Sequence, residues 1–189
     1  MIRIALLDDH PAVGAGLEAV LAPEPDLQLV GFATDEQDLR PLLERTHPAV
    51  IVLGVHDRGR GGLALCLQIK RQADPPAVVL YSGRTPTTFI VAGVVAGADA
   101  TVSKSSAVAT LLETIRQVAC GPRLSAPISP AMKAEAAARL DPADHAILAM
   151  RIAGDSPVDI AATLGVPGPE MADRLAAIIS TLEPALRVA

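Results

Sequence analysis

Short apolar segments rich in β-branched residues alternate with helical patterns from the N-terminus to residue 119. This alternation limits the fold more than any other feature, because apolar strands that alternate with helices form a parallel sheet with helices on both faces. The predicted strands are Ile2–Leu7, Leu27–Ala33, Val50–Leu53, Val78–Ser82 and Ala100–Ser103. The predicted helices between and after them are Pro11–Ala22, Asp35–Arg45, Gly62–Arg71, Pro86–Ala96 and Ser106–Ala119. The sequence therefore predicts an α/β fold with a doubly wound, five-stranded parallel sheet.

Polar or small residues stand at the ends of four predicted strands. Asp8 and Asp9 follow the first strand and Gly54 ends the third. Ser82 closes the fourth strand, and Lys104 follows the fifth. Because ligand sites of open α/β sheets lie at the carboxyl ends of the strands, we expect these residues around one crevice. Carboxylate oxygens are ligands for a hard cation such as Mg²⁺, so Asp8 and Asp9 are candidate metal ligands.

An acidic pair, a hydroxyl and a lysine at successive strand ends resemble the receiver domain of bacterial response regulators. The run Asp8–Pro11, followed by Gly16 and Leu17, resembles the NarL/FixJ subfamily in particular. The resemblance implies a CheY-like receiver over residues 1–120. It also implies that the phosphoryl-accepting aspartate of the family belongs at the position of Gly54.

Phosphorylation in the resembled family needs the acceptor aspartate together with a divalent cation, a lysine and a hydroxyl. Gly54 would remove the acceptor and one metal ligand, and Thr101 stands where the family usually carries an aromatic switch residue. Asp57 is a less favoured substitute acceptor, because the family spacing is met by Gly54 and Gly62. We therefore expect no phosphorylation switch and no bound cofactor, with any Mg²⁺ site weakened.

Two roles for the remaining crevice stay open. Asp8, Asp9 and Lys104 could form an ion-paired network that stiffens the crevice. Alternatively, the acidic pocket could bind a metal ion or a small ligand. The four histidines, His10 among them, are scattered along the sequence and predict no ligand cluster or triad. We expect no catalytic residues and no enzyme activity.

Proline and alanine dominate residues 121–139, which we interpret as a linker that could contain a short helix. Three helical patterns follow at Pro142–Ala153, Pro157–Leu164 and Pro169–Leu182. Their spacing resembles LuxR-type helix-turn-helix domains over about forty residues, which implies a small all-α domain at 140–189 whose last helix enters the DNA major groove.

The last predicted helix has an apolar face and an acidic polar face. Helical spacing predicts burial of Met171, Leu175, Ile178 and Leu182. The candidate DNA contacts on the polar face are Glu170, Asp173, Arg174, Ala177 and Thr181. From residue 133 onward, the sequence contains five Lys or Arg and eight Asp or Glu, so this region carries a net negative charge. Because neutralised phosphates supply most non-specific DNA affinity, we expect DNA binding to be weak or to require a dimer.

Two polar residues, Arg151 and Asp155, stand at positions that are apolar in the resembled domain. These two residues predict either a looser helical core or a polar contact surface.

The formal net charge of −5 is also unfavourable for nucleic acid unless cations gather on one face. No apolar run is long enough to span a bilayer. Two scattered cysteines, Cys66 and Cys120, are typical of a cytoplasmic protein.

These observations predict a cytoplasmic, atypical response regulator that acts on DNA as a homodimer without phosphorylation. A second hypothesis is a regulator that binds another protein, such as a genuine response regulator, and ignores DNA. A small-molecule sensor that uses the acidic crevice is compatible with either. The retained residues Asp8, Asp9, Ser82 and Lys104 also make Gly54→Asp a candidate for restoring phosphorylation.

Overall fold

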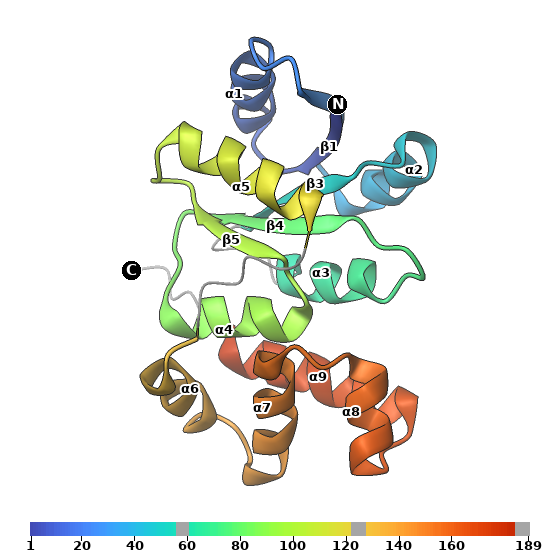
Figure 1. Cartoon of the computed structure of the whole chain (residues 1–189), viewed down its shortest axis with the longest axis vertical. Helices are drawn as coiled ribbons and strands as arrows, with labels where there is room; N and C mark the ends of the chain where they lie inside the picture. The colour runs from blue at the N-terminus through green and yellow to red at the C-terminus, as the bar shows by residue number, and fades with distance from the viewer. Residues whose placement is uncertain (56–60, 122–127, 184–189) are drawn as a thin grey trace.

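A five-stranded parallel sheet forms the centre of the upper part of the molecule in the computed structural model, which describes residues 1–55, 61–121 and 128–183 (Figure 1). The strand order is β2-β1-β3-β4-β5, and all four neighbouring pairs are parallel. The strands are β1 (Ile2–Leu7), β2 (Leu27–Ala33), β3 (Val50–Val55), β4 (Ala77–Ser82) and β5 (Ala100–Ser103). The predicted doubly wound fold is therefore confirmed.

Helices cover both faces of the sheet. The helices α1 (Pro11–Leu21) and α5 (Val108–Cys120) pack on one face. The other face is covered by α2 (Glu36–Thr46), α3 (Gly62–Lys70) and α4 (Thr87–Ala96). Because successive side chains of a strand point to opposite faces, β3 contributes to both cores. Val50 and Val52 join the α1/α5 core, whereas Ile51 and Leu53 join the other.

The C-terminal helices lie against the outer side of α4, away from the sheet (Figure 1). They are α6 (Pro130–Ala137), the 3₁₀ helix η1 (Pro142–Asp144), α7 (His145–Ala153), α8 (Pro157–Leu164) and α9 (Gly168–Leu182). We call residues 130–183 the C-terminal helical unit. The segment predicted as a linker thus contains α6, and the helix predicted at Pro142–Ala153 is divided into η1 and α7.

The boundaries of α8 coincide with the predicted ones because both ends carry strong local signals. Ser156 is its N-cap, and the Ser156 side chain accepts a hydrogen bond from the Asp159 backbone N–H at 3.2 Å. Pro157 fills the first helical position, where no N–H is needed. Gly165 ends the helix with a φ of 65°, a left-handed conformation that glycine adopts without strain.

Strand β3 is longer than predicted. The sequence indicated that the strand ends at Gly54 and that a loop begins at Val55. In the structure both residues continue the ladder with β4, Gly54 opposite Tyr81 and Val55 opposite Ser82. A glycine weakens a strand by itself, but pairing with a central neighbouring strand overrides that local preference.

No helix in the described parts of the chain is both long and apolar enough to cross a membrane.

Candidate functional site

Asp8 lies buried just after β1 and is paired with Lys104, which follows β5. Lys104 Nζ donates to Asp8 Oδ2 at 2.6 Å, and the backbone N–H of His10 donates to Asp8 Oδ1 at 3.0 Å. The Asp8 side chain is 0% exposed and the Lys104 side chain 20%. Removal of Lys104 would leave the fully buried Asp8 carboxylate without this counter-charge, which is strongly destabilising. The two predicted crevice residues therefore act structurally as one pair.

The Asp8 carboxylate also occupies the space beside Gly54. A Cβ atom added to Gly54 would overlap Asp8 Oδ2, and it would lie 2.7 Å from Asp8 Cγ and 2.9 Å from the backbone oxygen of Leu7. Real Cβ atoms do not approach other heavy atoms this closely. Any side chain at position 54 would therefore have to displace Asp8 from its present position.

Ser82 and Thr101 are both placed by the sheet. The Ser82 backbone oxygen accepts a hydrogen bond from the Lys104 backbone N–H at 2.7 Å, whereas the Ser82 hydroxyl is bonded to its own loop. Ser82 Oγ donates to the backbone oxygen of Arg84 at 2.8 Å and accepts from the Arg84 N–H at 3.3 Å. Thr101 lies on β5 and faces α4, where its Oγ1 would be 3.4 Å from a Cβ added to Gly93. The crevice proper thus consists of Asp8, Gly54 and Lys104.

Tyr81 is a crevice neighbour that the sequence analysis missed. Lys104 Nζ lies 5.6 Å from the centre of the Tyr81 ring, which is within cation–π range. Burial raises the pKa of the Tyr81 phenol above its ordinary value, and the nearby Asp8 carboxylate raises it further. Its position on β4, directly opposite Gly54, was the signal that could have placed it here.

Asp9 and His10 form the exposed edge of the crevice. His10 Nδ1 lies 2.6 Å from Asp9 Oδ1 and 3.6 Å from Asp8 Oδ1. Potential metal-ligand atoms of Asp8, Asp9 and His10 all lie within 4.8 Å of one another. The structure thus groups His10 with the acidic pair, although its sequence position predicted no cluster.

The donor set does not fit the magnesium site that the resemblance implies. Mg²⁺ prefers carboxylate and water oxygens in near-octahedral geometry. Gly54 supplies no carboxylate, and both oxygens of Asp8 already accept hydrogen bonds, one of them from the Lys104 ammonium. A divalent cation at Asp8 Oδ2 would have to compete with that ammonium.

The predicted substitute acceptor, Asp57, lies outside the described residues.

The outward face of α9 carries all five candidate DNA contacts. Glu170, Asp173, Ala177 and Thr181 are exposed in the docked arrangement. Arg174 is not available in the same way, because its Nη2 lies 2.6 Å from Asp144 Oδ1 and also donates to the Ala143 backbone oxygen at 2.6 Å. Arg174, the one basic residue of this face, is therefore bonded within the C-terminal helical unit.

The opposite face of α9 is buried as the spacing predicted. Met171, Leu175, Ile178 and Leu182 are at most 1% exposed, and Ile179 is 2% exposed. These side chains belong to the same apolar cluster as α3 and α4. Packing against the α/β part therefore uses the apolar face and leaves the candidate DNA face outward.

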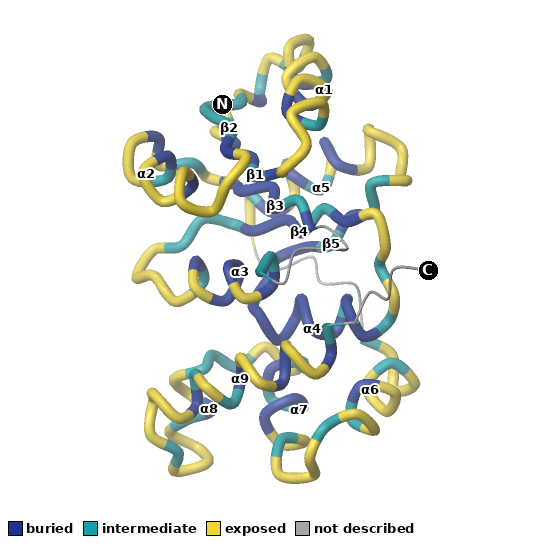
Figure 2. Tube along the Cα trace, turned by 180° about the vertical axis from the view of Figure 1, so that it is seen from behind, coloured by how far each residue is buried: buried dark blue, intermediate teal, exposed yellow. Residues whose placement is uncertain are grey.

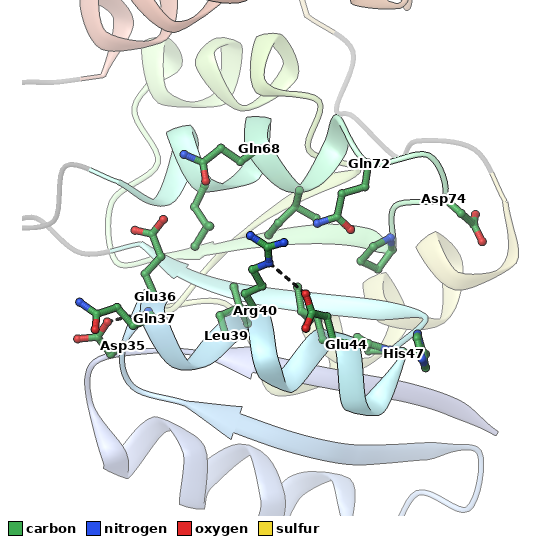
Figure 3. A pocket seen from close by; sticks show the side chains of 15 residues that line it. Asp35, Glu36, Gln37, Leu39, Arg40, Glu44, His47, Gln68, Gln72 and Asp74 are labelled. Atoms are coloured by element: carbon green, nitrogen blue, oxygen red, sulfur yellow. Dashed lines mark hydrogen bonds and ion pairs between the residues drawn. The ribbon is translucent and has the colours of Figure 1, made fainter.

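A separate groove of about 1140 Å³ runs between α2 and α3 (Figure 3). Leu39, Leu65 and Ile69 are buried residues of its lining, and polar side chains reach into it, such as Arg40 from α2 and Gln72 from the segment after α3. None of the crevice residues and none of the α9 candidates lines it. The groove is therefore distinct from both candidate sites.

Comparison with known families agrees with the strand-end geometry. The family model of the response regulator receiver domain matches residues 4–116, which is more than half of the chain. The chain belongs to the response regulator receiver family. The match covers β1 from Ile4 onward, the other four strands in full and most of α5, and it ends before the C-terminal helical unit.

Two regulators are similar over about two thirds of this chain. The transcriptional regulatory protein LiaR of Bacillus subtilis is 29% identical over 130 residues, which cover 68% of this chain and 62% of LiaR. The response regulator GacA of Pseudomonas aeruginosa is 30% identical over 127 residues, which cover 67% of this chain and 59% of GacA. The matched segment thus spans about three fifths of the length of these relatives.

Solved structures extend the likeness of fold to the C-terminal helices. A LuxR-family two-component response regulator from Aurantimonas is 27% identical, with a TM-score of 0.62 over 71% of this chain and 97% of that chain. RcsB from Salmonella typhimurium is 19% identical, with a TM-score of 0.61 over 96% of this chain and 90% of that chain. The RcsB match concerns the fold alone, and it includes the receiver and the helices that follow it.

Proposed function

We propose that this receiver protein works in transcriptional control without phosphoryl transfer to its strand-end crevice. The observation that carries this proposal is the buried Asp8–Lys104 pair, which occupies the space beside Gly54. Phosphoryl transfer to a receiver needs a carboxylate in line with the phosphoryl donor and charges that neutralise the transferred group. Here position 54, where the resemblance places that carboxylate, is a glycine, and Lys104 is ion-paired with Asp8.

The regulatory part of the proposal rests on the relatives. LiaR is named as a transcriptional regulatory protein, and RcsB has been solved bound to promoter DNA. By analogy, the outward face of α9 would contact DNA, and a homodimer would present two such faces. This face offers two exposed carboxylates, Glu170 and Asp173, and one arginine that is already paired. We therefore expect weak binding with a small salt dependence, because few phosphates would be neutralised.

Selection of genomic fragments on the purified full chain, followed by salt titration of the enriched DNA, tests this function. Recovery of a reproducible, roughly two-fold symmetric motif is the expected result. Absence of any enrichment would contradict DNA binding and leave the phosphorylation proposal standing.

A charge-matched pair of variants sharpens that test. Asp144→Ala and Asp38→Ala each remove one negative charge, but only Asp144→Ala releases Arg174 from its ion pair. Asp38 is exposed on α2, in a different part of the molecule. If α9 contacts DNA, Asp144→Ala should steepen the slope of log affinity against log salt by about one, and Asp38→Ala should not. Equal slopes for both variants would argue against α9 as the contact surface.

A second candidate function is protein binding by the same outward surface. It is favoured by the observation that Arg151 and Arg174 both make contacts within the chain, whereas Asp159, Glu170 and Asp173 are exposed. Val158 is 77% exposed and Leu164 36% exposed on neighbouring α8. Exposed carboxylates suit a partner with a cationic surface better than they suit DNA. In that case Glu170→Lys should leave the fragment selection empty and should weaken the complex with the partner.

A further inference from the structure

We infer that the receiver and the C-terminal helical unit form one cooperative folding unit, held together at the end of α4 by Arg151. Docking is then a permanent feature of the molecule and not a closed state from which the helices are released. This inference concerns the described residues of the chain, and it holds whether the outward face of α9 binds DNA or a protein.

The first observation is the burial of α4. Eight of its ten residues are buried, so the helix lacks a polar face. A helix that packs only on a sheet normally keeps one polar side toward water. On α4 the sheet and α3 cover one side and the C-terminal helical unit covers the other (Figure 2). Without the C-terminal helices, the receiver would expose a continuous apolar helix surface.

The second observation is that one hydrophobic cluster crosses the boundary. It includes Ile51 and Leu53 of the sheet, Val91 and Val95 of α4, and Leu175 of α9. Further buried members come from α6, α7 and α8, namely Ala136, Ile147, Leu148 and Ile160. Separate domains usually have a core of their own and meet through a more polar interface. Here the helices of the C-terminal helical unit share a core with the sheet.

The third observation is the position of Arg151, which is 2% exposed although it carries a full charge. Its Nε donates to the Val95 backbone oxygen at 3.0 Å, and its Nη2 lies 3.4 Å from the Val94 backbone oxygen. Its Nη1 donates to the Asp155 backbone oxygen at 2.7 Å. The guanidinium thus satisfies carbonyl groups at the end of α4 and just beyond α7 at once.

This placement is electrostatically favourable because the carboxyl end of a helix carries partial negative charge and free carbonyl groups. The backbone turns sharply there at Gly97, whose φ is 92°. A Cβ atom added to Gly97 would lie 3.2 Å from Arg151 Nη2, so the glycine also gives the guanidinium room to approach. Undocking would return the Arg151 charge to water, but it would remove the guanidinium from the Val95 carbonyl and would expose the shared core.

The candidate contacts on α9 face outward while its apolar face is buried, so this arrangement presents them without any separation of the two parts. Signals would therefore act on this surface, or on assembly of the protein, and not on release of the helices from the receiver.

Hydrogen exchange of the full chain at increasing urea concentration tests the inference. For the wild-type protein, the slowest amides of α7 and α9 should show the same opening free energy and the same urea dependence as the slowest amides of β3 and β4. The inference would be overturned if the α7 and α9 amides exchanged through a separate opening whose urea dependence is smaller than that of the sheet amides.

Two arginine variants separate the role of Arg151 from that of an ion pair inside the C-terminal helical unit. Arg151→Ala should speed exchange of the α7 and α9 amides about ten- to a hundredfold relative to the sheet amides. Arg174→Ala is the matched control, because its contacts with Asp144 and Ala143 stay inside the C-terminal helical unit. It should change both sets of amides by the same factor. Equal effects of the two variants would contradict the role of Arg151, and the wild-type measurement decides the cooperative unit even if Arg151→Ala does not fold.

Discussion

A glycine at the tip of a parallel strand leaves space that other side chains can take. At Gly54 that space is taken by the Asp8 carboxylate, which is neutralised by Lys104. From the sequence, the crevice could hold either an ion-paired network or a ligand pocket. The geometry favours the ion pair, because both oxygens of Asp8 already accept hydrogen bonds.

Lys104→Ala tests the pair directly. It should lower the free energy of unfolding by about 3 kcal/mol, because the fully buried Asp8 carboxylate would lose its counter-charge. The double variant Asp8→Asn/Lys104→Met should recover part of this loss, since no charge would remain buried. Urea denaturation followed by circular dichroism measures both. A loss below about 1 kcal/mol for Lys104→Ala would show that the pair behaves like an exposed one.

Gly54→Ala tests whether the space beside Gly54 is filled. The added methyl group meets Asp8 and the Leu7 carbonyl, so the substitution should cost about 1–3 kcal/mol. Gly16→Ala is the matched control: Gly16 lies in α1, and its added Cβ meets nothing within 4 Å. That change should stabilise the protein by up to about 1 kcal/mol through helix propensity. If both substitutions stabilise the protein, the space beside Gly54 is not filled as described.

The phenol of Tyr81 reports on the crevice by its titration. Tyr81 is the single tyrosine and the chain has no tryptophan, so ultraviolet absorbance follows this group alone. Burial and the Asp8 carboxylate raise its pKa, so its midpoint should lie above the ordinary value of 10.0. Because the folded-state pKa exceeds the unfolded one, this contribution to stability is complete below pH 10 and is lost as the pH rises through the folded value. Asp8→Asn should lower the titration midpoint of Tyr81. A wild-type midpoint at or below 10 would contradict the burial of the phenol beside the Asp8 carboxylate.

Among the elements, α9 differs most from what a DNA-reading helix needs. Its apolar face was predicted correctly, because residues three and four apart share a face of a helix. The fate of Arg174 could not be predicted, since its partner Asp144 lies thirty residues earlier, in a short 3₁₀ helix that the sequence pattern merged with α7.

A double-mutant cycle on Arg174 and Asp144 measures the strength of that contact. Each single alanine variant should be less stable than the wild-type protein, and the coupling energy should be about 1 kcal/mol. Their side chains are 25% and 18% exposed, so the pair is only partly screened by water. A coupling energy indistinguishable from zero would return Arg174 to the set of cations available for DNA.

Across the chain, the sequence predicted the elements better than the contacts between distant ones. The ends of α8 followed from Ser156, Pro157 and Gly165, which are local signals. The apolar character of α4 was also visible, but an all-apolar helix does not reveal what covers its second side. Similarly, Arg151 stood out as a polar residue at an apolar position, yet its partners on α4 are more than fifty residues away.

For the whole molecule, these contacts describe a receiver whose crevice is closed by an ion pair and whose C-terminal helices share its core. In a phosphorylated receiver, a charge change in the crevice biases the surrounding helices between two arrangements. Neither the charge change nor the second arrangement is expected here. The protein would then present the same surface at all times.

The most direct measurement is hydrogen exchange and intact mass of the full chain with and without acetyl phosphate and Mg²⁺. The expected result is an unchanged mass and the same exchange rates in α4, α7 and α9 under both conditions. Gain of one phosphoryl group, together with faster exchange of α7 and α9, would contradict both the closed crevice and the permanently docked helices.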